Sequence, residues 1–182
     1  MLIIPAMPAT GERPSLYKLG ETRTEINIDS AEENRNAAIS LAKQANYSLN
    51  IFTQDFDSLL YDNHDFEMHV AHLARKHPNT QIRILVQDSL PAVKKGHRLI
   101  QLAQNMSSSI FIRKPAKEYH DEKSSFLVAD GLGLLYRIFG DQRNYDASVN
   151  FMSPIRAKKL NEFFNEVWEH SEADSQVRRL YM

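Results

Sequence analysis

The stretch Tyr-His-Asp-Glu-Lys-Ser-Ser-Phe-Leu-Val-Ala-Asp, residues 119–130, decides the fold. Its apolar part, residues 126–129, has the length and composition of a buried strand. Its first half is polar and charged. Because side chains alternate along a strand, Lys123 and Ser125 share one face, whereas His120 is out of step with them by an odd number of residues. The stretch predicts a buried strand that follows a run of charged and polar groups.

Upstream of this stretch, strand-like and helix-like segments alternate. Ser30 and Glu33 form a capping-box pair, which marks the start of a helix. Strands are predicted at residues 25–28, 47–53, 81–87 and 109–113, with helices between them, the last over 91–105. The first two helices place on one face Ala38, Leu41, Ala42 and Ala45, and then Phe66, Val70, Leu73, Ala74 and His77. Since parallel strands need long crossovers, this alternation predicts a mainly parallel sheet.

After Pro115 the pattern changes to short strands joined by tight turns. Strands are predicted at residues 126–129, 132–139 and 147–151, antiparallel to one another. Ser153-Pro154 then marks the start of a final helix whose apolar side chains are Leu160, Phe163, Phe164, Val167 and Trp168. The predicted fold class is α/β, with a mixed, mostly parallel sheet flanked by helices.

Length and composition narrow the class of protein further. The 182 residues fit one domain, which we place at residues 22–170, between an extended N-terminal arm (1–21) and a C-terminal tail (171–182). With 22 basic and 23 acidic residues, the net charge of −1 favours neither nucleic acid nor an anionic membrane. The lack of cysteine excludes disulfides and thiolate metal sites. No apolar run reaches the length of a membrane span and the start lacks a secretory pattern, so we expect a cytoplasmic protein.

The stretch 119–130 and its surroundings resemble the phospholipase D superfamily, whose motif is His-x-Lys-x-x-x-x-Asp. With the motif aspartate set on Asp130, Lys123 stands in the place of the histidine nucleophile and Ser125 in the place of the lysine. Lysine is protonated near neutral pH and is a poor phosphorus nucleophile. The family also carries a Gly-Ser or Gly-Gly step followed by an Asn, where this chain has Arg137-Ile138. The resemblance therefore implies a degenerate phospholipase D-like site.

The same resemblance implies a partner. Catalytic members combine two His-Lys-Asp sets, from two halves of a chain or from a dimer, and this chain holds one half, so the resemblance implies a homodimer. Short segments are also similar to an uncharacterised group of small bacterial proteins, sometimes attached to acetyltransferase domains, in which we find counterparts of residues 53–57, 82–88, 96–99, 126–130 and 177–180.

A basic cluster precedes the motif strand and supplies the candidate ligand site. Arginine and lysine side chains here suit a phosphate-containing ligand or, more weakly, a nucleic-acid backbone, while an ordinary solvated face explains the cluster as well. His97 has two interpretations, an anion ligand or a histidine hydrogen-bonded at the rim of the core. Arg137 is expected to face and neutralise the motif aspartate. The candidate anion cleft consists of His97, Arg98, Arg113, Lys123, Asp130 and Arg137.

Acidic and histidine side chains elsewhere suggest weaker alternatives. Asp55 and Asp57 follow a strand end, where α/β folds build sites, but turn and helix-start preferences account for them. Asp65, His69 and His72 fall on one helix face, which a solvated surface explains more simply than a metal site. We therefore predict no metal and no cofactor.

Three functions follow from these observations. The first is a non-catalytic phospholipase D-like module that binds an anionic, phosphate-containing ligand or a protein partner, with no catalytic residues assigned. The second is a dimeric phosphodiesterase or nuclease in which His97 or His120 serves as a non-standard nucleophile. The third is a protein-interaction scaffold that uses Trp168 and the tail, and it predicts that deleting residues 171–182 removes binding of the partner without altering the fold.

Overall fold

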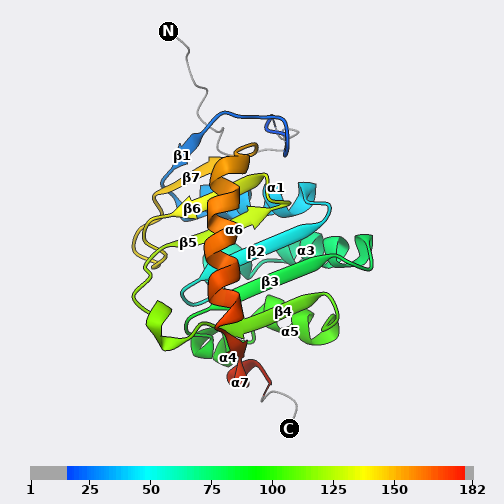
Figure 1. Cartoon of the computed structure of the whole chain (residues 1–182), viewed down its shortest axis with the longest axis vertical. Coiled ribbons are helices and arrows are strands. Elements are labelled where there is room, and N and C mark those ends of the chain that lie inside the picture. The colour runs from blue at the N-terminus through cyan, green and yellow to red at the C-terminus, as the bar shows by residue number, and fades with distance from the viewer. Residues whose placement is uncertain (1–15, 179–182) are drawn as a thin grey trace.

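One mixed β-sheet forms the middle layer of the protein (Figure 1). The computed structural model describes residues 16–178. Along the chain the elements are β1 (Ile26–Ile28), α1 (Ala31–Gln44), β2 (Ser48–Thr53), α2 (Ser58–Tyr61), α3 (His64–Lys76), β3 (Gln81–Val86), α4 (Leu90–Lys95), α5 (Arg98–Asn105), β4 (Ile110–Lys114), a 3-10 turn η1 (Lys117–Tyr119), β5 (Ser125–Ala129), β6 (Gly133–Arg137), β7 (Ala147–Asn150), α6 (Pro154–Glu169), β8 (Glu172–Ala173) and α7 (Ser175–Arg178).

The sheet has eight strands in the order β1-β7-β6-β5-β2-β3-β4-β8. A mixed sheet flanked by helices is confirmed, but the prediction that it is mostly parallel is wrong. Only the β2-β3 and β3-β4 pairs are parallel, and every other neighbouring pair is antiparallel. The reason is connectivity: helical crossovers join β2, β3 and β4, whereas short links join β5, β6 and β7, and both edge strands pair antiparallel.

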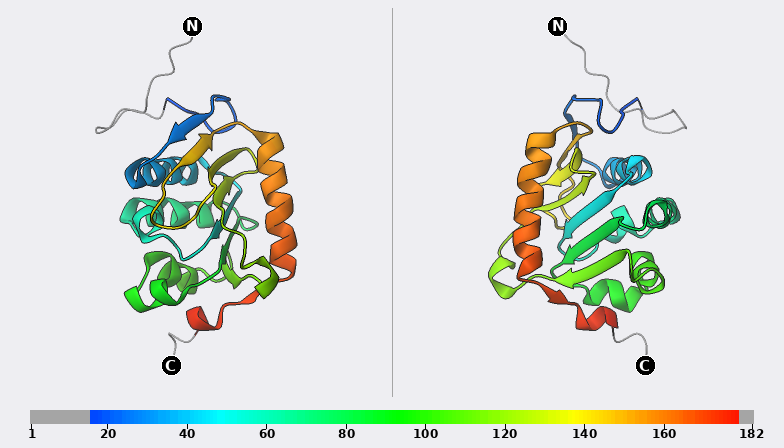
Figure 2. Two further views of the ribbon diagram at one scale, coloured as in Figure 1. Left: turned by 90° about the vertical axis from the view of Figure 1, so that its left-hand side faces the viewer. Right: turned by 45° about the vertical axis from the view of Figure 1, so that its right-hand side comes forward.

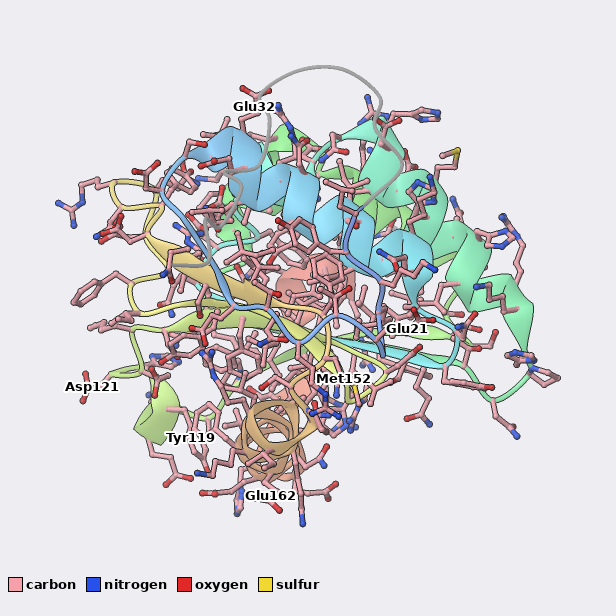
Figure 3. The ribbon with its side chains drawn as sticks, turned by 90° about the horizontal axis from the view of Figure 1, so that it is seen from above. Glu21, Glu32, Tyr119, Asp121, Met152 and Glu162 are labelled. Carbon is pink, nitrogen blue, oxygen red and sulfur yellow. The ribbon has the colours of Figure 1, made fainter. Side chains whose placement is uncertain are left out.

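Helices cover both faces of the sheet unequally (Figures 2 and 3). On one face α1, α3 and the α4–α5 pair lie side by side, and they enclose the larger core, which includes Leu41, Phe66 and Ile84. On the other face the single helix α6 packs on β2, β5 and β6, around Phe126 and Phe164. The first turn of α6 reaches β7, where Arg156 donates to the Ser148 hydroxyl at 3.1 Å, and β1 lies at the edge beyond β7.

Local signals placed most helix boundaries correctly. The capping box is present at α1, where the Ser30 hydroxyl accepts a hydrogen bond from the Glu33 N–H and the Glu33 carboxylate accepts one from the Ser30 N–H. The helix predicted over 91–105 is instead two helices, because Gly96 adopts φ 72° and ends α4. His77 was predicted to be a core residue but is exposed after the end of α3.

Both expected tails contribute to the domain. Residues 16–21 of the predicted arm pack on it, since the Gly20 N–H donates to the Phe151 carbonyl and Tyr17 stacks on Phe151, while residues 1–15 lie outside the described residues. In the predicted tail, β8 pairs with β4 and Val177 of α7 is buried. The apolar end, residues 180–182, also lies outside the described part.

Candidate functional site

The strand register decides which motif residues can meet. Phe52 of β2 pairs with Phe126, and Ser125 pairs with Arg137 of β6, so the start of β5 lies at the carboxyl end of β2. Asp130 follows the other end of β5, beside Ser48 at the start of β2. The expected contact between Arg137 and Asp130 is therefore wrong, because the length of the strand separates them.

Asp130 caps the start of β2. Its carboxylate accepts hydrogen bonds from the backbone N–H groups of Asn46 at 2.8 Å, Tyr47 at 2.8 Å and Ser48 at 3.0 Å. Its own backbone is held at φ 53°, in the left-handed region. Three backbone donors leave this carboxylate little capacity to orient an imidazole, so its role here is to connect two strands.

Arg137 forms a buried ion pair at the opposite edge. Its guanidinium donates to the Asp57 carboxylate at 2.7 Å and to the carbonyls of Asp141 at 2.6 Å and Asn144 at 2.8 Å. The exposed fractions of the Arg137 and Asp57 side chains are 2% and 1%. The Tyr145 ring stacks against the guanidinium at 4.5 Å, and its hydroxyl donates to Asp57. The protein itself therefore provides hydrogen-bond partners for both terminal nitrogens of Arg137, while its Nε has none among residues 16–178.

Burial sets the electrostatics of this cluster. It raises the pKa of the Asp57 carboxyl, while the adjacent Arg137 opposes the rise. It also raises the pKa of the Tyr145 hydroxyl to about 12, with Asp57 adding to the effect. The buried Tyr61 beside them likewise has a raised pKa.

The motif positions themselves lie beneath a loop. Ser125 is buried, and the Gly140 N–H donates to the Lys123 carbonyl at 2.7 Å. A Cβ on Gly140 would approach the Ser125 hydroxyl oxygen to 2.7 Å, so the loop packs directly on this serine. Lys123 extends its side chain into solvent. There is consequently no room at Ser125 for a phosphodiester.

Two glutamines, which the sequence did not single out, close the rest of this edge. Gln54 follows β2 and donates to the carbonyls of Glu122 and Ser124, each at 3.0 Å. Gln87 follows β3 and donates to the Glu122 carbonyl at 2.9 Å. The only signal in the sequence is a glutamine directly after each buried strand. These amides hold the segment before β5 across the carboxyl ends of the parallel strands.

His97 is a core histidine that caps a helix. It is 2% exposed, its Nδ1 accepts the Leu99 N–H at 3.2 Å, and its Nε2 lies 3.2 Å from the Phe56 carbonyl. These contacts require a neutral ring that donates from Nε2. Burial lowers its pKa, which agrees with that form. Of the two interpretations, the structure favours the histidine at the rim of the core.

The two remaining arginines are also engaged. Arg98 pairs with Asp62 at 3.7 Å and with Glu67 at 3.4 Å. Arg113 lies over the Trp168 ring at 4.8 Å, on the α6 side of the sheet. The structure therefore does not bring the six predicted anion ligands into one cleft. Within residues 16–178, no three acidic or histidine side chains are grouped as a metal site, and no helix is long and apolar enough to cross a membrane.

Solved structures share this fold. Nuc from Salmonella typhimurium, a phospholipase D family member, has a TM-score of 0.61 at 12% identity, over 83% of this chain and 97% of Nuc. NucT from Helicobacter pylori has a TM-score of 0.53 at 11% identity, over 83% of this chain and 99% of NucT. TrmBL2, an archaeal chromatin protein with a novel mode of DNA binding, has a TM-score of 0.61 at 15% identity, over 84% of this chain and 54% of TrmBL2. The chain thus spans about half of TrmBL2 and nearly all of Nuc and NucT.

These likenesses establish a phospholipase D-like fold, and at such low identity they establish the fold alone. No curated protein matches the chain in sequence. A family model described as Domain of unknown function (DUF7931) matches residues 30–180. Because that match covers most of the chain, the protein belongs to the DUF7931 family.

Proposed function

We propose that this protein is a non-catalytic phospholipase D-like module that works by binding a protein partner. The observation that carries the proposal is the closed edge at the motif. The buried Arg137–Asp57 pair lies there, and Gly140 packs on Ser125 at the position of the motif lysine. Hydrolysis of a phosphodiester needs an accessible nucleophile and cations directed at the phosphate, whereas at this edge Ser125 is buried and Arg137 already pairs with Asp57.

The available histidines do not replace the lost nucleophile. His97 uses both ring nitrogens inside the core. His120 is exposed at the end of the η1 turn, outside the strand that carries the motif positions. An imidazole acts as a nucleophile in this chemistry only beside groups that hold the phosphate, and the arginine nearest this edge is enclosed with Asp57.

The same geometry favours a protein partner over an anion. Arg98 and Arg137 already pair with carboxylates, and Arg113 stacks on Trp168. TrmBL2, described as binding DNA, shares the fold, but this chain has a net charge of −1. A tail-based scaffold is less favoured, because residues 172–178 are built into the sheet and the core.

A hydrolysis assay tests the proposal. We expect the purified protein to cleave bis(p-nitrophenyl) phosphate and single-stranded DNA no faster than buffer, with and without divalent cations. The variants His97→Gln and His120→Ala should give the same background, which separates a trace contaminant from the protein's own activity. Cleavage above background that His120→Ala abolishes would establish the phosphodiesterase alternative and end this proposal.

A further inference from the structure

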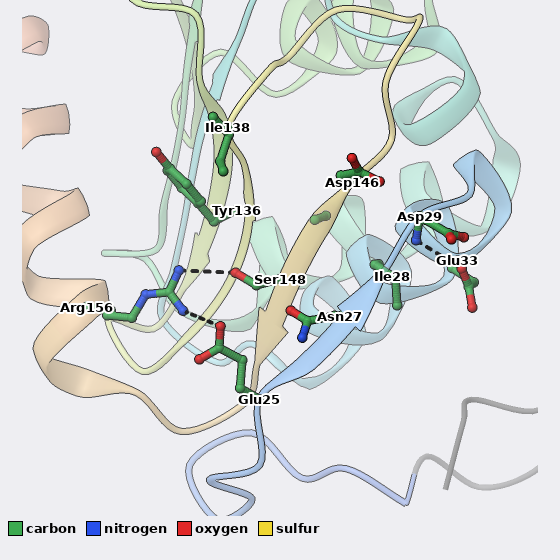
Figure 4. A pocket seen from close by; sticks show the side chains of 11 residues that line it. Glu25, Asn27, Ile28, Asp29, Glu33, Tyr136, Ile138, Asp146, Ser148 and Arg156 are labelled. Carbon is green, nitrogen blue, oxygen red and sulfur yellow. Dashed lines mark hydrogen bonds and ion pairs between the residues drawn. The ribbon is translucent and has the colours of Figure 1, made fainter. Parts of the chain in front are cut away.

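A groove of about 720 Å³ lies on the face of the sheet that carries α6, beside the first turn of that helix (Figure 4). Strands β6, β7 and β1 form its floor, and the first turns of α6 and α1 flank it. This volume is within the range of ordinary ligand sites, about 300–1,000 Å³. It adjoins the closed motif edge through the end of β6 and through Asp146, whose neighbour Tyr145 contacts both Arg137 and Asp57. The lining residues are Glu25, Asn27, Ile28, Asp29, Glu33, Tyr136, Ile138, Asp146, Ala147, Ser148 and Arg156.

The groove is acidic. Four carboxylates and one guanidinium line it, which leaves a formal charge of −3, against −1 for the whole chain. Arg156 pairs with Glu25 at 3.1 Å at one end. Among residues 16–178, Asp29 and Asp146 have no ion-pair partner, and Figure 4 shows them with Glu33 at the other end. That end therefore attracts positive charge.

An apolar wall faces these carboxylates. Tyr136 projects from β6, and Ile138, just past the end of the strand, is 63% exposed within the groove lining. Its neighbour Phe139 is 52% exposed. Large apolar side chains exposed beside a polar-rimmed groove are typical of interaction surfaces. The groove thus offers an apolar contact and separate acidic contacts to one ligand.

We infer that this groove binds a basic segment of a partner protein, with an apolar side chain against Tyr136 and Ile138 and lysine or arginine side chains at Asp29, Glu33 and Asp146. The inference rests on the proposed binding function and names its partner class. Charge complementarity selects the occupant. The chain's own residues 1–15 carry one arginine and one glutamate, so they offer no net positive charge to match the groove.

Peptide binding tests the inference. The probe is a fluorescent, end-blocked peptide of alternating lysine and leucine, with a glutamate–leucine peptide and spermidine for comparison. We expect anisotropy to report binding of the lysine peptide that weakens as salt rises. The double variant Asp29→Asn, Asp146→Asn should bind about tenfold more weakly, and Ile138→Ala about fivefold more weakly.

The matched control is the double variant Asp65→Asn, Asp121→Asn, which removes the same charge from exposed positions outside the groove. It should bind the lysine peptide like the unaltered protein. Equal weakening by both double variants would overturn the inference, because it would reflect net charge alone. So would absence of binding, preference for the glutamate peptide, equal competition by spermidine, or a change of oligomeric state in the groove variant. None of these outcomes involves hydrolysis, so they are separate from a failure of the proposed function.

Discussion

At the scale of single residues, Arg137 and Asp57 form the buried ion pair at the edge of the sheet where β5 begins. Both side chains are almost fully buried, and their removal from water is offset by the 2.7 Å contact and two carbonyl acceptors. A lone buried charge has no such compensation. Replacing one charged side chain of the pair should therefore lower the free energy of unfolding far more than replacing both.

We expect Arg137→Met to lower the free energy of unfolding by about 3–5 kcal/mol, because Asp57 is left buried and unpaired. The double variant Arg137→Met, Asp57→Asn should recover a large part of that loss, since asparagine keeps the helix cap at Leu59 without the charge. Urea unfolding measures the free energy of unfolding of the unaltered protein, of Arg137→Met and of the double variant. Arg143→Met, at a side chain 90% exposed, is the control and should leave the midpoint unchanged.

A double variant as unstable as Arg137→Met would contradict this account, because the loss would then come from packing and not from the unpaired charge.

His97 should make stability depend on pH. Its pKa is lowered in the folded state by burial, so the unfolded chain takes up a proton first as pH falls. The stabilising contribution of the neutral His97 ring to the folded state is complete above the pKa of histidine in the unfolded chain, about 6.5, and is lost progressively below it. We expect His97→Asn, which retains a capping acceptor for Leu99, to show a shallower loss of stability from pH 7 to 5.5 than the unaltered protein.

The exposed His64 provides the control, since His64→Gln should keep the full dependence on pH. Thermal unfolding between pH 7 and 5.5 measures the dependence of stability on pH for each protein. Superimposable pH curves for His97→Asn and the unaltered protein would show that the neutral ring is not what stabilises this turn.

At the scale of elements, the C-terminal segment belongs to the domain. β8 pairs with the edge of β4, Gln104 of α5 donates to the Val177 carbonyl, and Val177 is 8% exposed. The expectation that residues 171–182 can be deleted without altering the fold therefore does not agree with the contacts. An exposed β4 edge would also favour unwanted pairing between chains.

Val177→Ser should lower the free energy of unfolding by about 1.5 kcal/mol, because a buried valine side chain is lost from the core. Ile155→Ser is the matched control, since Ile155 is 74% exposed on α6 and should have no measurable effect. Truncation after Ser171 should destabilise more than Val177→Ser and promote aggregation. Circular dichroism and light scattering measure the stability and the aggregation of the truncated chain. A monodisperse truncated protein of unaltered stability would contradict the prediction.

For the whole molecule, the homodimer remains a prediction. The resemblance that implies it concerns proteins that bring two motif sets together, and here the motif edge is closed by the chain's own loop. Sedimentation velocity over a range of concentrations measures the mass. A species of twice the 21.0 kDa chain mass would confirm the dimer, and a single species at the chain mass would contradict it.

Both the groove and the closed edge arise from how one sheet is covered. α6 packs on β2, β5 and β6 and reaches β7 with its first turn, and polar side chains of β7 and β1 line the groove beside that turn. The sequence did not indicate this groove, because its eleven lining residues come from five separate segments with no common motif. Ile138 and Phe139 were predicted to belong to the strand at residues 132–139, whereas β6 ends at Arg137 and both side chains are exposed.

The sequence by itself predicted strands β1 to β7 and the capping box that begins α1. These features depend on side-chain alternation and on hydrogen bonds between residues three or four apart, so short segments suffice to predict them. Only the tertiary structure decided that Arg137 pairs with Asp57, eighty positions away, that Asp130 caps β2, and that His97 lies in the core. Strand order and register bring such residues together, and both result from the packing of the whole chain.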